Sequence, residues 1–364
     1  MKKISIIGSG VLGLSIAEYL SRGKKNGNEI QIISSNNPLA GSYAAAANLA
    51  TKGQLFGRDK HFQVKLDAKK CYQNWIKNLI LEVEVDLKIK SVFKLGLGID
   101  FFSSHYNRDK QYKRVKQDDD ELKNKNLPLD FILKEGERKI KYQQEAWVNS
   151  FVLMQLLTDV LVKRKVNFIN KIFTKNELEK LSEEGLQHKI IFCTGAWTES
   201  LLKDLEIPIP DQMKKAKRIT VGTTFYGNNI FENYSEEYVL MERVAENMKT
   251  KVTMSGPIDN QSISASTLKI DDINVFDETD LLEKNKELIK LCSESFANDP
   301  YLAKEKIKNL EYKTGLRVGY GHSELVIEKL NIKCDQLTGY VCAGAHKSGF
   351  LFAPMVGTQL EKLF

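Results

Sequence analysis

The first part of the chain alternates between short apolar runs and a helical spacing of apolar residues. Lys3–Ile7 and Glu29–Ser34 are both rich in isoleucine, which predicts two buried β-strands. Between them, Val11–Ser21 carries apolar residues at helical spacing, which predicts an α-helix. A strand, a helix and a second strand in such close succession predict a βαβ unit.

The same reading predicts further elements along the rest of the chain. Helices are expected at 66–80, from a cap at Asn149 or Ser150 to about Val162, near 279–296, and after a turn at 344–349. Strands are expected at 91–93, 99–102, 139–142, 166–169, 188–194, 219–225, 252–255 and 340–343. The most polar stretch, 107–126, mixes basic and acidic side chains and is expected to be a surface loop.

Composition narrows the class of protein. The 42% hydrophobic content allows a packed core, and no apolar run approaches the ~18–20 residues of a membrane span, so a cytoplasmic protein without a membrane partner is expected. The net charge of +7 is scattered, which favours a solvated surface over a nucleic-acid groove. The five cysteines and five histidines show no metal-ligand spacing, so free thiols and no metal are expected.

Gly8–Gly13 has the pattern Gly-x-Gly-x-x-Gly between the first predicted strand and the first predicted helix. In such a turn the first glycine allows a tight bend, and the second lets the backbone approach a pyrophosphate. The third glycine lets the helix pack closely on the strand, and the N–H groups of the helix N-terminus face the phosphates. The alternative is a glycine-rich turn without a ligand, but the strand-to-helix context favours dinucleotide binding.

One part of the dinucleotide pattern is missing. The second strand usually ends in an Asp or Glu that binds the ribose hydroxyls, whereas here it ends in Ser34. A serine offers a hydroxyl but no bidentate carboxylate. Either Ser34, Ser35 and Asn36 hold the ribose together, or the affinity for adenosine is lower.

A second glycine turn, Gly344–Gly349, also lies between a predicted strand and a predicted helix. A nicotinamide enzyme has no need of such a turn, whereas reduced flavin carries negative charge that a helix N-terminus stabilises. His346 or Lys347 would add positive charge there. A simple packing turn would explain the glycines but not the presence of two such turns.

Six segments resemble, in the same order, motifs of the D-amino-acid oxidase and glycine oxidase group of FAD-dependent oxidoreductases. They are Gly8–Gly13, Gly41–Asn48, Glu145–Asn149, Ile190–Trp197, Thr314–Arg317 and Tyr340–Pro354. These segments span nearly the whole chain. The sequence departs from the family pattern at Ser34, Asn48, Val318 and His322, which bears on the substrate more than on the fold.

The resemblance implies FAD as the cofactor and, as the substrate, a small amine that carries a carboxylate. Arg317 stands where the family binds that carboxylate through two parallel hydrogen bonds, and the implied reaction passes a hydride from the carbon bearing nitrogen to flavin N5. The implied cofactor-binding residues are Gly8, Gly10, Val11, Leu12, Gly13, Ser34, Ser35, Ser42, Ala46, Thr194, Gly195, Gly344, His346, Lys347, Ser348, Gly349 and Phe350. Further candidates for the pocket lining are Tyr226, Tyr238, Arg243 and Tyr320.

Cofactor motifs at the start, middle and end of the chain predict an α/β protein with two interleaved domains. A Rossmann-type FAD-binding domain is expected from 1–80, 145–205 and 311–364. A smaller α+β substrate domain with a mixed β-sheet is expected from 81–144 and 206–310.

Three other functions fit parts of the sequence. A related branch of the family removes a carboxymethyl group from a modified uridine in tRNA, and the net charge of +7 slightly favours it. An NAD-dependent dehydrogenase fits the first glycine turn but leaves the second unexplained. A catalytically degenerate flavin-fold protein is the third alternative, suggested by Ser34.

Overall fold

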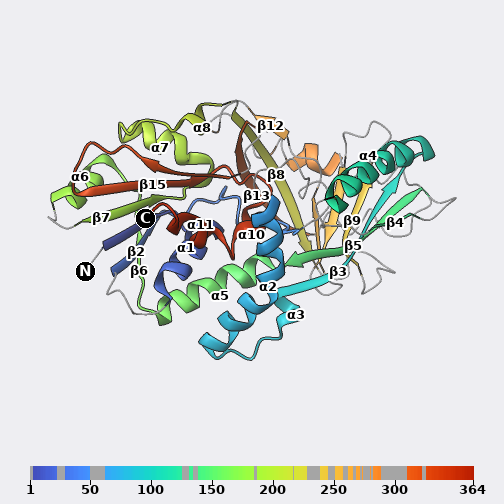
Figure 1. Cartoon of the computed structure of the whole chain (residues 1–364), viewed down its shortest axis with the longest axis horizontal. Coiled ribbons are helices and arrows are strands. Elements are labelled where there is room, and N and C mark those ends of the chain that lie inside the picture. Colours follow the sequence, from blue (N-terminus) through green and yellow to red (C-terminus); the bar gives the residue numbers. More distant parts are fainter. Residues whose placement is uncertain are drawn as a thin grey trace.

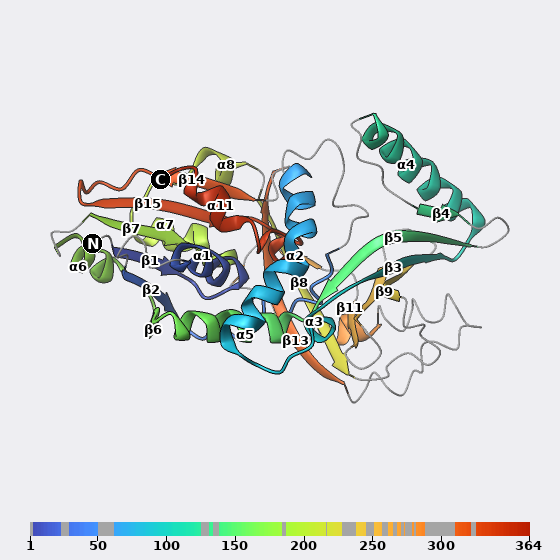
Figure 2. The ribbon, with the colours of Figure 1, turned by 60° about the horizontal axis from the view of Figure 1, so that its bottom comes forward.

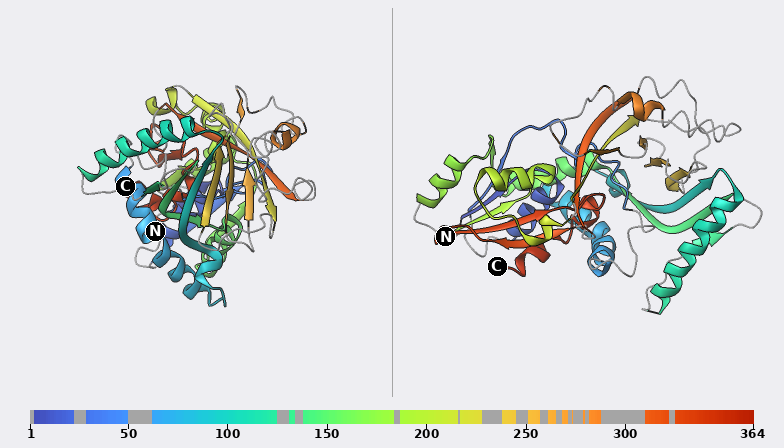
Figure 3. Two further views of the ribbon diagram at one scale, coloured as in Figure 1. Left: turned by 90° about the vertical axis from the view of Figure 1, so that its right-hand side faces the viewer. Right: turned by 90° about the horizontal axis from the view of Figure 1, so that it is seen from above.

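A computed structural model gives the structure of the protein. It describes residues 3–22, 29–49, 62–124, 131–133, 138–183, 187–215, 217–227, 238–244, 251–256, 261–264, 268–270, 273, 279, 282–287, 310–321 and 325–364. Two β-sheets organise these residues, and both chain termini lie at the end of the molecule that holds the smaller sheet (Figure 3).

The smaller sheet has six strands in the order β14-β15-β7-β1-β2-β6 (Figure 1). Its strands are β1 (Lys3–Ile7), β2 (Glu29–Ser34), β6 (Asn167–Asn170), β7 (His188–Phe192), β14 (Val326–Leu330) and β15 (Leu337–Ala343). Only the β14–β15 pair is antiparallel within this described sheet. Parallel pairing with helical connections is the arrangement of a Rossmann-type sheet, so the predicted α/β class is confirmed.

Helices cover both faces of this sheet. One face carries α1 (Val11–Ser21), α2 (Phe62–Val83), α5 (Ser150–Lys163), α10 (Gly349–Phe352) and α11 (Val356–Glu361), and the other carries α6 (Lys175–Glu183), α7 (Thr198–Asp204) and α8 (Asp211–Lys214). Alternation along β1 produces this split, because Ile4 and Ile6 pack with the first set of helices while Ile7 packs with the second.

The larger sheet has nine strands and is mixed (Figure 2). Its strands are β3 (Phe93–Phe102), β4 (Phe131–Leu133), β5 (Lys139–Val148), β8 (Lys217–Gly227), β9 (Tyr238–Val244), β10 (Lys251–Ser255), β11 (Gln261–Ser264), β12 (Leu268–Ile270) and β13 (Glu311–Tyr320). The β3–β9 pair is parallel and the other described pairs are antiparallel. β13 pairs with β8 along its length. The predicted division of the chain into two domains remains a proposal.

The predicted elements of the opening βαβ unit agree with β1, α1 and β2 to the residue. Asn149 caps α5 as predicted, because its side chain accepts hydrogen bonds from the backbone N–H groups of Phe151 (3.1 Å) and Val152 (3.2 Å). Most of the helix predicted near 279–296 lies outside the described residues. Within this range, residues 282–287 are described and are helical.

Two local predictions were wrong. The predicted loop at 107–126 is mostly helix α4 (His105–Lys123), which stands at the edge of the larger sheet (Figure 2). Lysine, arginine, glutamine and glutamate favour helices, so charge alone did not indicate a loop. The strand predicted at 91–93 begins only at Phe93, after the short helix α3 (Ile89–Val92).

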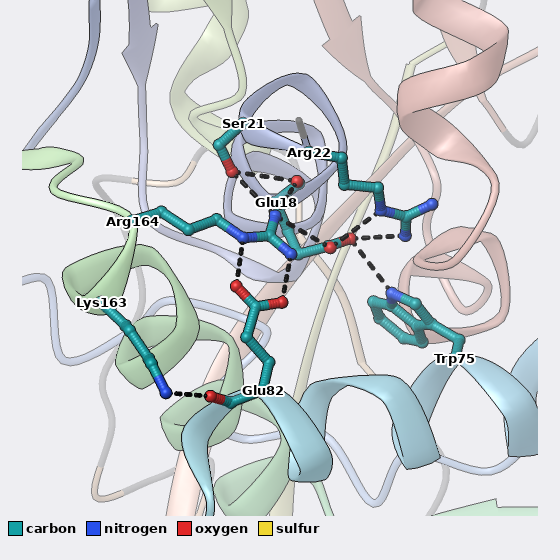
Figure 4. A network of polar contacts seen from close by, with 7 residues as sticks. All are labelled: Glu18, Ser21, Arg22, Trp75, Glu82, Lys163 and Arg164. Carbon is teal, nitrogen blue, oxygen red and sulfur yellow. Dashed lines mark hydrogen bonds and ion pairs between the residues drawn. The ribbon is translucent and has the colours of Figure 1, made fainter. Parts of the chain in front are cut away.

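An ionic network centred on the buried Glu18 joins α1, α2 and α5 (Figure 4). The Glu18 carboxylate accepts hydrogen bonds from Arg22 (2.9 and 2.6 Å) and from the Trp75 indole N–H (3.1 Å). Arg164 lies 3.2 Å from the same carboxylate and donates two hydrogen bonds to Glu82. Because these groups come from three helices, the network links the helices of this layer to one another.

Candidate active site

The turn between β1 and α1 leaves an open space above one of its three glycines. A Cβ atom on Gly8 (φ 111°) would lie 2.5 Å from the carbonyl oxygen of Cys193, and one on Gly13 would lie 2.0 Å from that of Gly8. A Cβ atom on Gly10 would approach only the Ser42 Oγ, at 3.2 Å, among the described residues. The first and third glycines are therefore required by packing, whereas the space at Gly10 suits the close approach of a pyrophosphate.

Ser34 lies at the end of β2, where the ribose-binding acid was expected. Its Oγ lies 2.8 Å from the Oγ of Ser9, which belongs to the glycine turn. The site thus presents paired hydroxyls there. The next parallel strand, β6, ends beside β2. The residues that follow it, Lys171, Phe173 and Thr174, line the cavity that Ser34 and the glycine turn also line. Sequence reasoning missed this segment, although parallel strands end at a common edge of a sheet.

The C-terminal turn brings His346 toward the larger sheet. Gly344 (φ 78°) and His346 (φ 46°) both adopt left-handed backbone conformations. His346 Nε2 lies 3.1 Å from Thr220 Oγ1. Burial, followed by the positive charges of Arg317, Arg218 and Lys347, lowers the pKa of His346 to about 3. His346 is therefore neutral at pH 7 and does not supply the positive charge that the sequence suggested. The other residue suggested for that charge, Lys347, is exposed.

Two glycines let the segment after β2 pass directly over β13. A Cβ atom on Gly315 would lie 2.7 Å from the Ala44 Cβ, and one on Gly41 would lie 2.4 Å from the carbonyl oxygen of Leu316. The Leu316 N–H donates to the carbonyl oxygen of Leu39 at 3.0 Å. This packing puts the next residue of β13, which is Arg317, beside the segment that resembles the family's flavin-binding loop.

Arg317 is partly buried and lines the cavity. Burial lowers the pKa of its guanidinium to about 10, so the group remains a cation at pH 7. It makes no hydrogen bond or ion pair with any other residue that the structure describes. Since a buried charge is costly without a partner, this guanidinium suits an anionic ligand.

One cavity of about 1310 Å³ collects nearly all of the predicted site residues. Of the predicted cofactor-binding residues, only Gly13 and Ser348 are absent from its lining: Gly13 packs beneath Gly8, and the buried Ser348 donates its N–H to the carbonyl oxygen of Ala345. Tyr226, Tyr238 and Tyr320 do not line it, and the Arg243 side chain lies outside the described set. The Tyr226 hydroxyl instead donates to the carbonyl oxygen of Ala45 at 3.4 Å.

The cavity fits FAD better than a metal. Glycine turns, the N-terminus of α1 and paired hydroxyls provide sites for a pyrophosphate and a ribose along one continuous space. No group of three or more His, Cys, Asp or Glu side chains suited to a metal ion occurs within the described residues. None of the described helices is long and apolar enough to cross a membrane.

Known structures share this architecture. Glycine oxidase from Geobacillus kaustophilus superposes with a TM-score of 0.69 at 12% identity, covering 100% of this chain and 95% of that chain. L-α-glycerophosphate oxidase from Mycoplasma pneumoniae, solved with FAD bound, gives 0.67 at 13% identity, covering 100% and 95%. Iminodiacetate oxidase from Chelativorans sp. BNC1 gives 0.65 at 15% identity, covering 98% and 94%. At these identities the likeness shows the fold alone.

A comparison with curated proteins by sequence finds no match. The family model described as FAD dependent oxidoreductase (DAO) matches residues 3–363, which is nearly the whole chain. The predicted resemblance and the predicted cofactor are thus confirmed, and the chain belongs to the DAO family of FAD-dependent oxidoreductases.

Proposed function

We propose that the protein oxidises the C–N bond of an amino acid or of a related amine that carries a carboxylate. The observation that carries this proposal is Arg317, a partly buried guanidinium without a hydrogen-bond or ion-pair partner in the described part of the chain, in the same cavity as the glycine turn. A carboxylate is the ligand that best matches its planar pair of N–H donors. Proteins of similar structure include glycine oxidase, iminodiacetate oxidase and L-proline dehydrogenase, whose names specify substrates of this kind.

In this proposal bound FAD supplies the chemistry by accepting a hydride from the carbon that bears nitrogen. The chain supplies position and electrostatics. Gly10 and the N–H groups of Leu12 and Gly13 at the start of α1 hold the pyrophosphate, while the Val11 N–H donates to Ser42 Oγ at 3.0 Å, and Ser34 with Ser9 holds the ribose. Arg317 binds the substrate carboxylate and thereby turns the amine-bearing carbon toward the cofactor. Because His346 is neutral, it does not compete with Arg317 for the carboxylate. Its ring instead contacts Thr220 on β8.

Two variants of Arg317 test this proposal. Arg317→Ala should lower kcat/KM by on the order of 10²-fold or more, the scale of a lost charged pair of roughly 3–5 kcal/mol. Arg317→Lys should chiefly raise KM, because lysine keeps the charge but loses the bidentate geometry. Bound FAD, measured from the visible spectrum, should stay the same in both variants.

The matched control is Arg218→Ala. Arg218 is another arginine beside His346, but it is exposed and does not line the cavity. It should retain kcat/KM within about threefold of wild type, since exposed charges contribute little. Near-normal turnover of the substrate by Arg317→Ala would refute carboxylate binding by this residue.

A further inference from the structure

Residues 44–48, four alanines followed by an asparagine, form a segment that lines the cavity and that we call the strap. Hydroxyl groups from other elements bind its carbonyl oxygens. Thr224 Oγ1 on β8 donates to the first of these oxygens, on Ala44, at 2.8 Å. Two hydroxyls donate to the carbonyl oxygen of the next alanine: Ser150 Oγ at the start of α5, at 2.9 Å, and the Tyr226 hydroxyl on β8, at 3.4 Å. Burial raises the pKa of Tyr226, so its hydroxyl keeps the proton that it donates.

These contacts determine where the N–H groups of the strap point. In a trans peptide the N–H points opposite to the C=O of the same peptide unit. The N–H groups of Ala45 and Ala46 therefore point away from β8 and α5. The carbonyl oxygen of Ala47 accepts a hydrogen bond from the Val148 N–H on β5 at 3.2 Å, so the Asn48 N–H likewise points away from β5.

The N–H groups of the strap are available to a ligand. None of the five has a hydrogen-bond partner among the residues that the structure describes. Since backbone N–H groups in partly buried positions are nearly always paired, a row of them beside a cavity suits a ligand rich in hydrogen-bond acceptors.

The position of the strap indicates which part of FAD it meets. Ser42, two residues before the strap, accepts a hydrogen bond from the Val11 N–H at 3.0 Å and so lies at the pyrophosphate turn. The ribose site at Ser34 is at the end of β2 in the smaller sheet, whereas the strap contacts the larger sheet. A Cβ atom on Gly315 of β13 would lie 2.7 Å from the Ala44 Cβ. Because the pyrophosphate joins the two halves of FAD, the strap lies on the riboflavin side.

We propose that Thr224, Tyr226 and Ser150 are positioning residues for the flavin. By binding the carbonyl oxygens of the strap from behind, they fix its peptide planes so that the N–H groups donate to acceptor atoms of the flavin ring. A hydrogen bond to the carbonyl also polarises the peptide and strengthens its N–H as a donor. Reduced flavin carries negative charge, so these donors stabilise it more than the neutral oxidised ring. The inference concerns the cofactor alone and holds whatever the substrate is.

The test measures the Kd of each apoprotein for FAD and the midpoint potential of the bound flavin. Thr224→Val keeps the shape of the side chain without its hydroxyl, and it should weaken the binding of oxidised FAD by about tenfold, the scale of one lost hydrogen bond. The binding of reduced FAD should weaken by about tenfold more, which lowers the midpoint potential by about 30 mV. Thr224→Ser restores the hydroxyl and should return both values to those of wild type. Tyr226→Phe should change both in the same direction but by less, because its hydrogen bond is longer.

The matched controls are Thr158→Val and Tyr340→Phe. Thr158 Oγ1 donates to the carbonyl oxygen of Met154 at 2.9 Å, the Tyr340 hydroxyl donates to that of Leu363 at 3.3 Å, and neither residue lines the cavity. Both controls lose the same kind of hydrogen bond and should keep the wild-type Kd and midpoint potential.

A merely structural role for these hydroxyls predicts a different result. It would lower thermal stability and weaken the binding of both redox states equally, which leaves the midpoint potential unchanged. A wild-type potential in Thr224→Val and in Tyr226→Phe would therefore overturn the proposal, as would equal shifts in the control variants. If Thr224→Val does not fold, Tyr226→Phe decides alone. The turnover of Arg317→Ala tests the proposed function separately, because none of these measurements uses a substrate.

Discussion

The fold does not require glycine at position 10, which makes Gly10 the sharpest test of cofactor binding. Its φ of −68° is one that any residue adopts, and the nearest described atom to an added Cβ is the Ser42 hydroxyl at 3.2 Å. In Gly10→Ala, and more strongly in Gly10→Val, the new side chain enters the space kept for the pyrophosphate. Losing one or two charge-assisted hydrogen bonds, at roughly 1.5–3 kcal/mol each, should raise the Kd for FAD by about 10-fold to more than 1000-fold.

The assay is a titration of FAD into each apoprotein, followed by quenching of flavin fluorescence, together with thermal unfolding of the apoprotein. Gly13→Ala is the contrasting variant, because its Cβ would lie 2.0 Å from the Gly8 carbonyl oxygen. That variant should lose thermal stability as well as FAD, whereas Gly10→Val should lose FAD while its apoprotein unfolds within a few degrees of wild type. Wild-type affinity for FAD in Gly10→Val would refute the assignment of this turn to the pyrophosphate.

Three further predictions concern the ribose site, pH and the ionic network. Ser34→Ala, which removes the contact with Ser9, should weaken FAD binding about 3–10-fold, and Ser34→Glu should tighten it; equal affinities in the same titration would contradict the assignment. His346 has a folded pKa of about 3 and an unfolded pKa near 6.5, so the free energy of unfolding should be constant above pH 6.5 and fall by up to about 1.4 kcal/mol per unit as the pH drops toward 3. His346→Asn should reduce that slope in urea unfolding, and an unchanged slope would count against a buried neutral imidazole. Glu18→Ala should cost about 3–5 kcal/mol in urea unfolding, whereas Glu84→Ala, at an exposed ion pair, should cause no measurable loss; similar losses in both would show that the network does not stabilise the helical layer.

Local order in the sequence explains why the opening βαβ unit was predictable. β1, α1 and β2 follow one another directly, so their apolar spacing and the intervening glycines are sufficient to place them. The larger sheet joins segments that are far apart in the chain. β13 pairs with β8, and β3 pairs in parallel with β9 more than a hundred residues away. No apolar spacing specifies which of several similar strands become neighbours.

The candidate site likewise contains residues that local sequence reveals and residues that only the pairing of distant strands places. Gly8 and Gly13 were predictable because each obeys a steric requirement of one turn. Arg317 was predictable only through the order of motifs, since nothing in its own strand marks it as facing a cavity. Glu242 on β9 also lines the cavity and was missed, because its place depends on the register of β9 with β3 and β10, which the sequence does not reveal.

Three of the four departures from the family pattern, Ser34, Asn48 and Val318, line the cavity, and the fourth, His322, lies outside the described residues. Val318 stands where the family carries proline, and here it lies opposite Ile219 inside a strand, is 3% exposed, and accepts a hydrogen bond from the His346 N–H. A valine suits such a position, whereas proline would remove an amide N–H from mid-strand. Asn48 lines the cavity, and its Oδ1 is buried without a hydrogen-bond partner in the described part of the chain. Since an orphaned buried acceptor is costly, Asn48 is suited to receive a donor from a ligand. These three departures therefore change the lining of the cavity, while the strands and glycines that build it are kept.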